Sequence, residues 1–174
     1  MDYVESTASL ALRLKETAES AGLTAATAES CTGGLIAGAI TAVPGSSAFF
    51  LGGVVSYANS VKSEVLGVPQ EVLDTVGAVS SECAAAMAEG AARLTGADIA
   101  VSVTGIAGPD GGTPQKPVGT VWFGLKTPRG TSTELKEFSG GRDEVRALTV
   151  VNALTLLIGA AQERCAKPAG EDDG

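Results

Sequence analysis

The sequence contains no histidine among its 174 residues. Histidine is the usual general base near neutral pH and a common metal ligand, so its absence excludes every Ser-His-Asp and Cys-His mechanism. Any hydrolytic chemistry must take its base from another side chain. Cysteine is scarce as well: Cys31, Cys83 and Cys165 are an odd number without a Cys-x-x-Cys pair. This pattern predicts reduced thiols rather than a disulfide framework or a zinc site.

Long apolar runs are also missing. No continuous run approaches the roughly 18 residues of a membrane span, and Met1–Glu5 lacks the basic and hydrophobic regions of a secretory signal. These absences predict a cytoplasmic protein that does not contact membranes. The formal net charge of -8 argues against broad nucleic-acid binding, which depends on cations that neutralise phosphates. An anionic ligand would have to be held by a local group of residues.

The composition is that of one globular domain. Hydrophobic residues make up 44% of the chain and charged residues 18%, which is enough for one substantial core at this length. We expect a single domain over residues 1–166. Residues 167–174 combine proline, glycine and acidic side chains with nothing to bury, so this segment is predicted to be a disordered acidic tail.

The hydrophobic pattern alternates between helical and strand-like segments. It predicts helices over about 4–21, 35–43, 59–66, 80–94 and 142–164, and strands over about 23–29, 50–57, 97–104, 118–126 and 131–138. The last helix is apolar over much of its circumference, so we expect it to be deeply packed or to form an oligomer interface. Alternating strands and helices followed by a hairpin predict a mixed sheet with helices on both faces. Ligands bind such sheets beyond the carboxyl ends of their strands.

Ser30 stands at the first of these strand ends, in Glu29–Gly34 (Glu-Ser-Cys-Thr-Gly-Gly). The two glycines permit a tight turn that leaves backbone N–H groups exposed, and such donors can hold an oxyanion. Ser30 is therefore our candidate nucleophile, although a serine before a helix commonly serves only as a cap. Cys31 is a rival nucleophile, but without a histidine partner it is better explained as a small buried hydrophobe.

Lys62 and Tyr57 are the candidate proton-handling residues. Asn59 is a plausible N-cap that would place Lys62 in the first turn of a helix, where the dipole and partial burial would lower the pKa of its amine. A neutral lysine could then activate Ser30. A lysine beside a glutamate, here Glu64, is more often a solvated surface residue, and a tyrosine that closes a strand is often a core aromatic.

A glycine-rich loop follows the third predicted strand, from Gly105 to Pro117. Its backbone donors could cradle a phosphate or a substrate, or the loop could simply lead to the hairpin. It lacks the Gly-Lys-Ser/Thr of a Walker A loop, and Gly33-Gly34 does not fit a dinucleotide fingerprint, so ATP and NAD are not expected. Arg142 and Arg146 begin the final helix and could bind a phosphate, or they could be solvated.

Three separated motifs together resemble a known family. Glu29–Gly34, then Ser56–Asn59 (Ser-Tyr-Ala-Asn) with Lys62, and then Thr104–Gly112 (Thr-Gly-Ile-Ala-Gly-Pro-Asp-Gly-Gly) occur in the order found in the CinA C-terminal domain family. The resemblance runs from the first helix to about residue 160. Stand-alone members of this family include nicotinamide-nucleotide amidases.

The resemblance implies a fold, a reaction and a set of site residues. The fold is a three-layer α/β/α sandwich with a mixed, mainly parallel sheet of about five to six strands, in a homo-oligomer. The reaction converts nicotinamide mononucleotide and water to nicotinate mononucleotide and ammonia, with no metal and no organic cofactor. The family's catalytic serine, tyrosine and lysine fall on Ser30, Tyr57 and Lys62. Its substrate contacts fall on Gly33, Gly34, Ser46, Thr104, Gly105 and Arg142, the last as a candidate for the phosphate.

Two other functions fit the same residues. The pocket could belong to a non-catalytic nucleotide-binding or competence-related interaction module, or to an amidase for another small amide, because Ser-Lys chemistry does not specify the leaving group. The nucleotide pyrophosphatase activity linked to the N-terminal domain of two-domain CinA proteins is not expected here, since this chain has no room for that domain.

Overall fold

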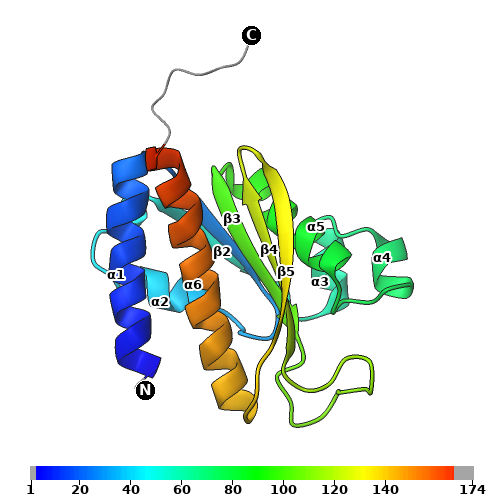
Figure 1. Cartoon of the computed structure of the whole chain (residues 1–174). Helices are drawn as coiled ribbons and strands as arrows, with labels where there is room; N and C mark the ends of the chain where they lie inside the picture. Colours follow the sequence, from blue (N-terminus) through cyan, green and yellow to red (C-terminus); the bar gives the residue numbers. More distant parts are fainter. Residues whose placement is uncertain (1–2, 167–174) are drawn as a thin grey trace.

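The computed structural model describes the backbone of residues 3–166 and the side chains of residues 7–166. The predicted tail over 167–174 lies outside the described residues. Most predicted segments are found within a few residues of their expected ends (Figure 1). The elements are α1 (Tyr3–Ala21), β1 (Ala25–Glu29), α2 (Leu35–Thr41), the 3-10 helix η1 (Ser46–Ala48), β2 (Phe50–Val55), α3 (Asn59–Glu64), α4 (Gln70–Asp74), α5 (Ser81–Thr95), β3 (Ile99–Gly105), β4 (Thr120–Thr127), β5 (Gly130–Glu137) and α6 (Arg142–Ala166).

The five strands form one mixed sheet in the order β2-β1-β3-β4-β5. β1 pairs in parallel with β2 and β3, whereas β4 is antiparallel to both β3 and β5. Four strands therefore share one direction and β4 opposes them, which confirms the expected mixed, mainly parallel sheet. The parallel strands β2, β1 and β3 end at the same edge, with Glu29 opposite both Val55 and Val103.

Side chains along β3 alternate between two hydrophobic clusters, as they must in a strand covered on both faces. Val101 and Val103 belong to the cluster under α1, α2 and α6, while Ala100 belongs to the cluster under α5. All three side chains are buried. Helices on both faces of the sheet (Figure 1) confirm the predicted three-layer α/β architecture.

Small residues let α5 approach the sheet and its neighbours closely. A Cβ at Gly124 of β4 would lie 2.3 Å from the carbonyl oxygen of Ala84, and one at Gly90 of α5 would lie 2.1 Å from that of Leu66. Both distances are far below a normal van der Waals contact. Ser102 donates a hydrogen bond of 2.5 Å to the same Ala84 carbonyl. Glycine at these positions therefore fixes how near α5 lies to β4 and to the segment after α3.

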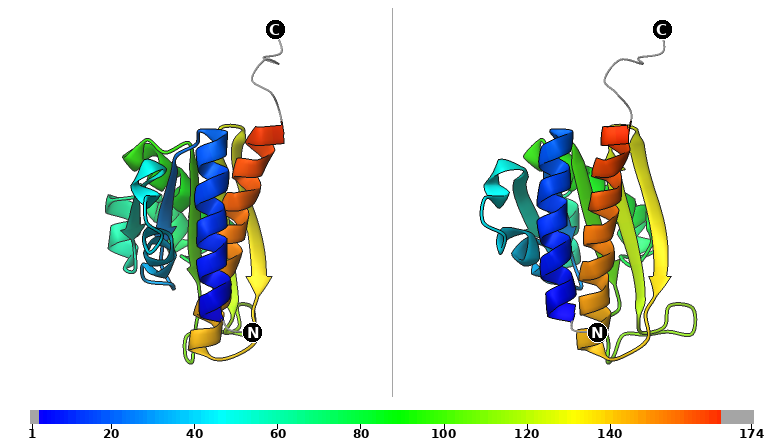
Figure 2. Two further views of the ribbon diagram at one scale, coloured as in Figure 1. Left: turned by 90° about the vertical axis from the view of Figure 1, so that its left-hand side faces the viewer. Right: turned by 60° about the vertical axis from the view of Figure 1, so that its left-hand side comes forward.

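The opposite face is covered by α1 and α6, which run side by side in the same direction (Figure 2). By length and composition α6 could span a membrane: its apolar window has a mean hydropathy of 1.5, but 44% of that window is buried inside the domain. Core helices of globular proteins show the same combination. One face of α6, which includes Leu154 and Leu157, is buried against the sheet, as the alternative of packing predicted. Ala147, Val151 and Leu156 are only partly buried, so an oligomer interface on this helix stays a prediction.

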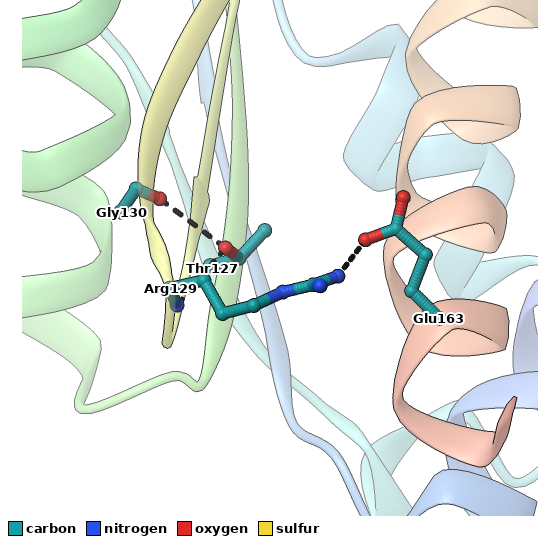
Figure 3. A network of polar contacts seen from close by, with 4 residues as sticks. All are labelled: Thr127, Arg129, Gly130 and Glu163. Atoms are coloured by element: carbon teal, nitrogen blue, oxygen red, sulfur yellow. Dashed lines mark hydrogen bonds and ion pairs between the residues drawn. The ribbon is translucent and has the colours of Figure 1, made fainter. Parts of the chain in front are cut away.

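The β4-β5 hairpin is tied to the far end of α6. Arg129, in the turn of the hairpin, pairs with Glu163 of α6, and the Thr127 hydroxyl donates to the Gly130 carbonyl across the same turn (Figure 3). Both charged side chains are largely exposed, so the pair adds little to stability. Its position, at the opposite end of α6 from Arg142, keeps it away from the strand ends described next.

Candidate functional site

The carboxyl ends of β1, β2 and β3 surround a cavity of about 310 Å³. Ser30 follows β1 and Thr104 lies near the end of β3, and both line the cavity together with Lys62 of α3 and Arg142 of α6. The backbone N–H of Ser30 donates to the Val103 carbonyl over 3.0 Å, which fixes the serine between the two strands. The site therefore lies where ligands of open α/β sheets usually bind.

Lys62 and Ser30 are in direct contact. The Lys62 Nζ lies 3.1 Å from the Ser30 Oγ, although the residues are 32 positions apart in the chain. The same nitrogen donates to the carbonyls of Ser56 at 2.8 Å and Tyr57 at 3.2 Å. Lys62 is only 1% exposed and Ser30 only 9%. The predicted alternative of a solvated surface lysine is therefore wrong.

Burial lowers the pKa of the Lys62 amine below its ordinary value of 10.5, because desolvation disfavours the ammonium form. Our expectation that a helix dipole would contribute to this shift is wrong. Helix α3 has only six residues, its N-cap is Ala58 rather than Asn59, and Lys62 lies in its last turn. The dipole at that end favours a cation, so desolvation alone accounts for the direction.

Two backbone carbonyls define what the Lys62 amine can do when it is neutral. A neutral amine has two N–H groups and one lone pair, and the Ser56 and Tyr57 carbonyls accept the two N–H groups. The lone pair then points to the remaining neighbour, the Ser30 hydroxyl. In this protonation state Lys62 can accept the Ser30 proton without rearrangement, which is the geometry that a general base requires.

Tyr57 takes part in the site through two different groups. Its carbonyl accepts from Lys62, whereas its phenol accepts a hydrogen bond of 3.3 Å from Arg142. The side chain is 61% exposed, so it is not the core aromatic that a strand-closing tyrosine often is. Among the described residues no hydrogen bond joins this phenol to Ser30 or Lys62. Arg142 also donates to the Gly108 carbonyl over 2.9 Å, so Arg142 connects the glycine-rich loop to Tyr57.

Glu29 organises the turn that follows Ser30, a role that was not predicted from the sequence. Its buried carboxylate accepts four hydrogen bonds. The donors are the Thr32 hydroxyl and the backbone N–H groups of Gly34, Ile36 and Ala37. Gly34, the N-cap of α2, has a positive φ of 103° and no side chain to cap the helix, so the Glu29 carboxylate from the preceding strand satisfies these N–H groups instead.

Cys31 is a poor nucleophile in this environment. Burial raises the pKa of its thiol to about 11, with a smaller contribution in the same direction from the negative charge of Glu29. At neutral pH the thiolate, which is the reactive form, is therefore scarce. The geometry favours Ser30, whose hydroxyl has a base within hydrogen-bond distance.

The structure brings together six of the nine residues predicted for the site: Ser30, Tyr57, Lys62, Thr104, Gly105 and Arg142 all line the cavity. Gly33 and Gly34 form the turn behind Ser30, and neither they nor Ser46 is among the residues that line it. Ser46 lies before β2, near the amino ends of the strands, because the chain must return there to begin a second parallel strand.

Further cavity residues had no predicted substrate contact. The cavity is also lined by Asn59, Ile106, Ala107, Gly108 and Asp110. Asp110 belongs to the Thr104–Gly112 motif, but nothing in the sequence distinguished a catalytic residue from a turn residue at this position. Within residues 7–166 no group of three or more cysteine or acidic side chains is arranged to hold a metal ion.

Comparison with known proteins connects this geometry to a family. The model of the CinA C-terminal domain matches residues 7–161. The chain belongs to this family. A CinA-like protein of Geobacter metallireducens is 56% identical over 136 residues, and one of Citrifermentans bemidjiense is 55% identical over 148 residues. These matches cover 78% and 85% of this chain but only 33% and 35% of those relatives, so the chain spans about a third of the length of the curated relatives it matches.

CinA-family structures match nearly the whole domain. The competence/damage inducible protein CihA of Agrobacterium tumefaciens superposes with a TM-score of 0.86 at 46% identity, over 89% of this chain and 95% of that chain. A CinA superfamily protein of Klebsiella pneumoniae gives the same TM-score at 37% identity, over 90% and 98%. The CinA resemblance and the α/β fold expected from the three motifs are thereby confirmed.

Proposed function

We propose that this CinA-family domain is an amidohydrolase that converts nicotinamide mononucleotide and water to nicotinate mononucleotide and ammonia. The observation that carries the proposal is the buried contact between the Lys62 amine and the Ser30 hydroxyl, 3.1 Å apart. The chain has no histidine, and a lysine with a lowered pKa supplies the base that an acyl transfer to serine requires.

The reaction begins when the Lys62 Nζ takes the proton of Ser30 and the Oγ bonds to the carboxamide carbon. The resulting oxyanion accepts hydrogen bonds from backbone N–H groups of the turn after Ser30. The carbon–nitrogen bond then breaks, and the departing nitrogen takes the proton from Lys62 and leaves as ammonia. Lys62 next takes a proton from water, the hydroxide attacks the ester carbon, and the proton returns to the Ser30 Oγ as the acid is released.

The charges around the cavity suit a nucleotide. Arg142 supplies a guanidinium at the mouth, and such a group binds phosphate through two parallel N–H donors. Its present acceptors, the Gly108 carbonyl and the Tyr57 phenol, are neutral, so a phosphate would compete with them effectively. We assign Tyr57 to the placement of Arg142, because its phenol accepts a hydrogen bond from that guanidinium; the predicted role of Tyr57 in proton handling stays a prediction. Thr104 and Gly105 line the same cavity as Lys62.

We also propose that the domain works in the cytoplasm as a homo-oligomer, without nucleic-acid or membrane partners. The net charge of -8 supports the exclusion of nucleic acid, and the burial of α6 in the core supports the exclusion of a membrane span. The oligomer rests on the family resemblance and is tested by light scattering of the purified chain.

Ammonia release from nicotinamide mononucleotide tests the function. The purified chain should release ammonia and the acid in equal amounts, Ser30→Ala should lower kcat about 10³-fold or more, and Cys31→Ala should continue to turn over. A Ser30→Ala variant with undiminished activity would refute the mechanism. An intact chain that binds the nucleotide without releasing ammonia would instead identify a binding module, and release from other small amides alone would identify a different amidase.

A further inference from the structure

Arg146 lies one helical turn after Arg142 on α6 but makes entirely different contacts. Its Nε donates to the Cys31 carbonyl and its Nη2 to the Thr32 carbonyl, each over 3.2 Å. It is not among the residues that line the cavity, so the expectation that Arg146 binds a phosphate is not supported by its position. Both acceptors belong to the turn that directly follows Ser30.

These contacts fix the orientation of successive peptide groups. The C=O and N–H of a trans peptide point in opposite directions, so two carbonyls held toward α6 direct the N–H groups of Thr32 and Gly33 away from it. The Gly33 N–H donates to the Ser30 carbonyl over 3.1 Å. That bond orients the peptide between Ser30 and Cys31, whose N–H is the first backbone donor after the nucleophile.

Two side chains of opposite charge hold the turn, one through its carbonyls and the other through its hydrogen-bond donors. The guanidinium of Arg146 binds two carbonyls, while the carboxylate of Glu29 binds the Gly34 N–H and the Thr32 hydroxyl. The guanidinium also lies close to Gly33, where an added Cβ would come within 3.8 Å of the Arg146 Nη2. At this position lysine would have to reach both carbonyls from a single nitrogen, whereas arginine offers each carbonyl a separate nitrogen of a planar fork.

From this geometry we infer that Arg146 is a positioning residue for the reaction: it holds the turn after Ser30 so that the Cys31 N–H can bind the oxyanion. The inference rests on the proposed acyl transfer to Ser30. Arg146 touches neither the substrate nor the reacting atoms and acts through the Cys31 and Thr32 carbonyls.

Arg146→Lys and Arg146→Ala test this role, with Arg164→Lys and Arg164→Ala as matched controls. Arg164 lies in the last turn of the same helix, is exposed and is not part of the cavity. We expect the Arg146 variants to lower kcat about 10- to 100-fold, as misplacement of a reacting group by about 1 Å does, with KM for nicotinamide mononucleotide nearly unchanged. Millimolar methylguanidinium should restore part of the kcat of Arg146→Ala, and the control variants should behave as wild type.

A purely structural role predicts a different result. Arg146→Lys would then unfold more easily by circular dichroism, but kcat per folded molecule would match wild type and methylguanidinium would not raise it. That outcome would overturn the inference while leaving the amidase proposal intact.

A second readout does not depend on the nucleotide substrate. A fluorophosphonate probe phosphonylates an activated serine and places a similar oxyanion in the same position, and intact mass spectrometry measures its rate of attachment to Ser30. We expect Arg146→Lys to slow this labelling by the same factor as kcat. If wild type releases no ammonia but labels faster than Arg146→Lys, the substrate is wrong and Arg146 keeps its role. If Ser30 is neither labelled nor active in wild type, both proposals fail.

Discussion

Gly90→Ala offers a sharp test of how the fold holds Lys62. A Cβ at this position in α5 would lie 2.1 Å from the Leu66 carbonyl oxygen. An ordinary contact begins near 3.4 Å, so the two backbones must separate by about 1 Å. Both groups are rigid: the Leu66 carbonyl also accepts from Arg93 over 2.9 Å, and the obstacle is backbone rather than the end of a flexible side chain.

The stability cost follows from two opposing effects. Overpacking of this kind costs about 3 kcal/mol, whereas replacing glycine by alanine inside a helix returns about 0.5–1 kcal/mol. The net expectation is a loss of about 2 kcal/mol, which lowers Tm by about 4–8 °C in a chain of this length. Gly159→Ala is the matched control, because Gly159 lies in α6 with nothing within 4 Å of its added Cβ, and it should be neutral or stabilising.

The same substitution should impair activity. The segment after α3 is bound to Lys62 itself, since the Val68 N–H donates to the Lys62 carbonyl over 3.0 Å. Displacing Leu66 therefore lengthens the 3.1 Å separation of the Lys62 Nζ from the Ser30 Oγ. Thermal denaturation and ammonia release at a temperature where both variants are folded provide the assay. A Gly90→Ala variant with the stability and kcat of Gly159→Ala would refute the reasoning.

Three further predictions concern charged groups of the site. Because desolvation holds the pKa of Lys62 below 10.5 in the folded chain, the unfolded chain binds more protons between the two pKa values, so stability should rise with pH across that window. The value of kcat/KM should rise as the pH passes the folded-state pKa of Lys62 and level off above it. In Lys62→Met, urea titrations at several pH values should lose the slope in stability, and activity should be absent. Arg142→Ala should raise KM for nicotinamide mononucleotide about tenfold or more and leave any activity on free nicotinamide unchanged, as steady-state kinetics on both substrates would show. Glu29→Gln should destabilise the chain by about 1–3 kcal/mol in urea unfolding, because a carboxamide nitrogen would face a donor; equal stability of variant and wild type would contradict the capping role.

The elements that set the fold were predictable because each is a local pattern. The apolar residues of α1 follow the helical period, and β3 is a run of apolar residues typical of a strand. Turns that contain glycine or proline mark the ends of such segments. The mixed sheet with helices on both faces followed from the alternation of strands and helices and the final hairpin, whereas the strand order β2-β1-β3-β4-β5 was not predicted. The short helices η1 and α4 were missed because three to five residues carry no periodicity.

The candidate site was only partly predictable. Ser30, Tyr57 and Thr104 were expected near one another because parallel strands end at one edge of a sheet. Of the two causes expected to lower the pKa of Lys62, burial is confirmed and the helix dipole is wrong. Ser46 could not be placed, since sequence alone does not say at which end of the sheet a short connection lies. Glu29 carries the signal of a carboxylate just before a glycine turn and helix, and this pattern could have suggested a cap.

The two carbonyls that accept from Lys62 belong to the main chain of residues 56 and 57. Every amino acid supplies a carbonyl, so side-chain substitutions at these positions leave the acceptors of the amine in place as long as the backbone keeps its path. A substitution at Tyr57 can therefore change the rim of the cavity while the Lys62 amine keeps both carbonyl acceptors. Removing these acceptors would require a change in the path of the backbone at residues 56 and 57.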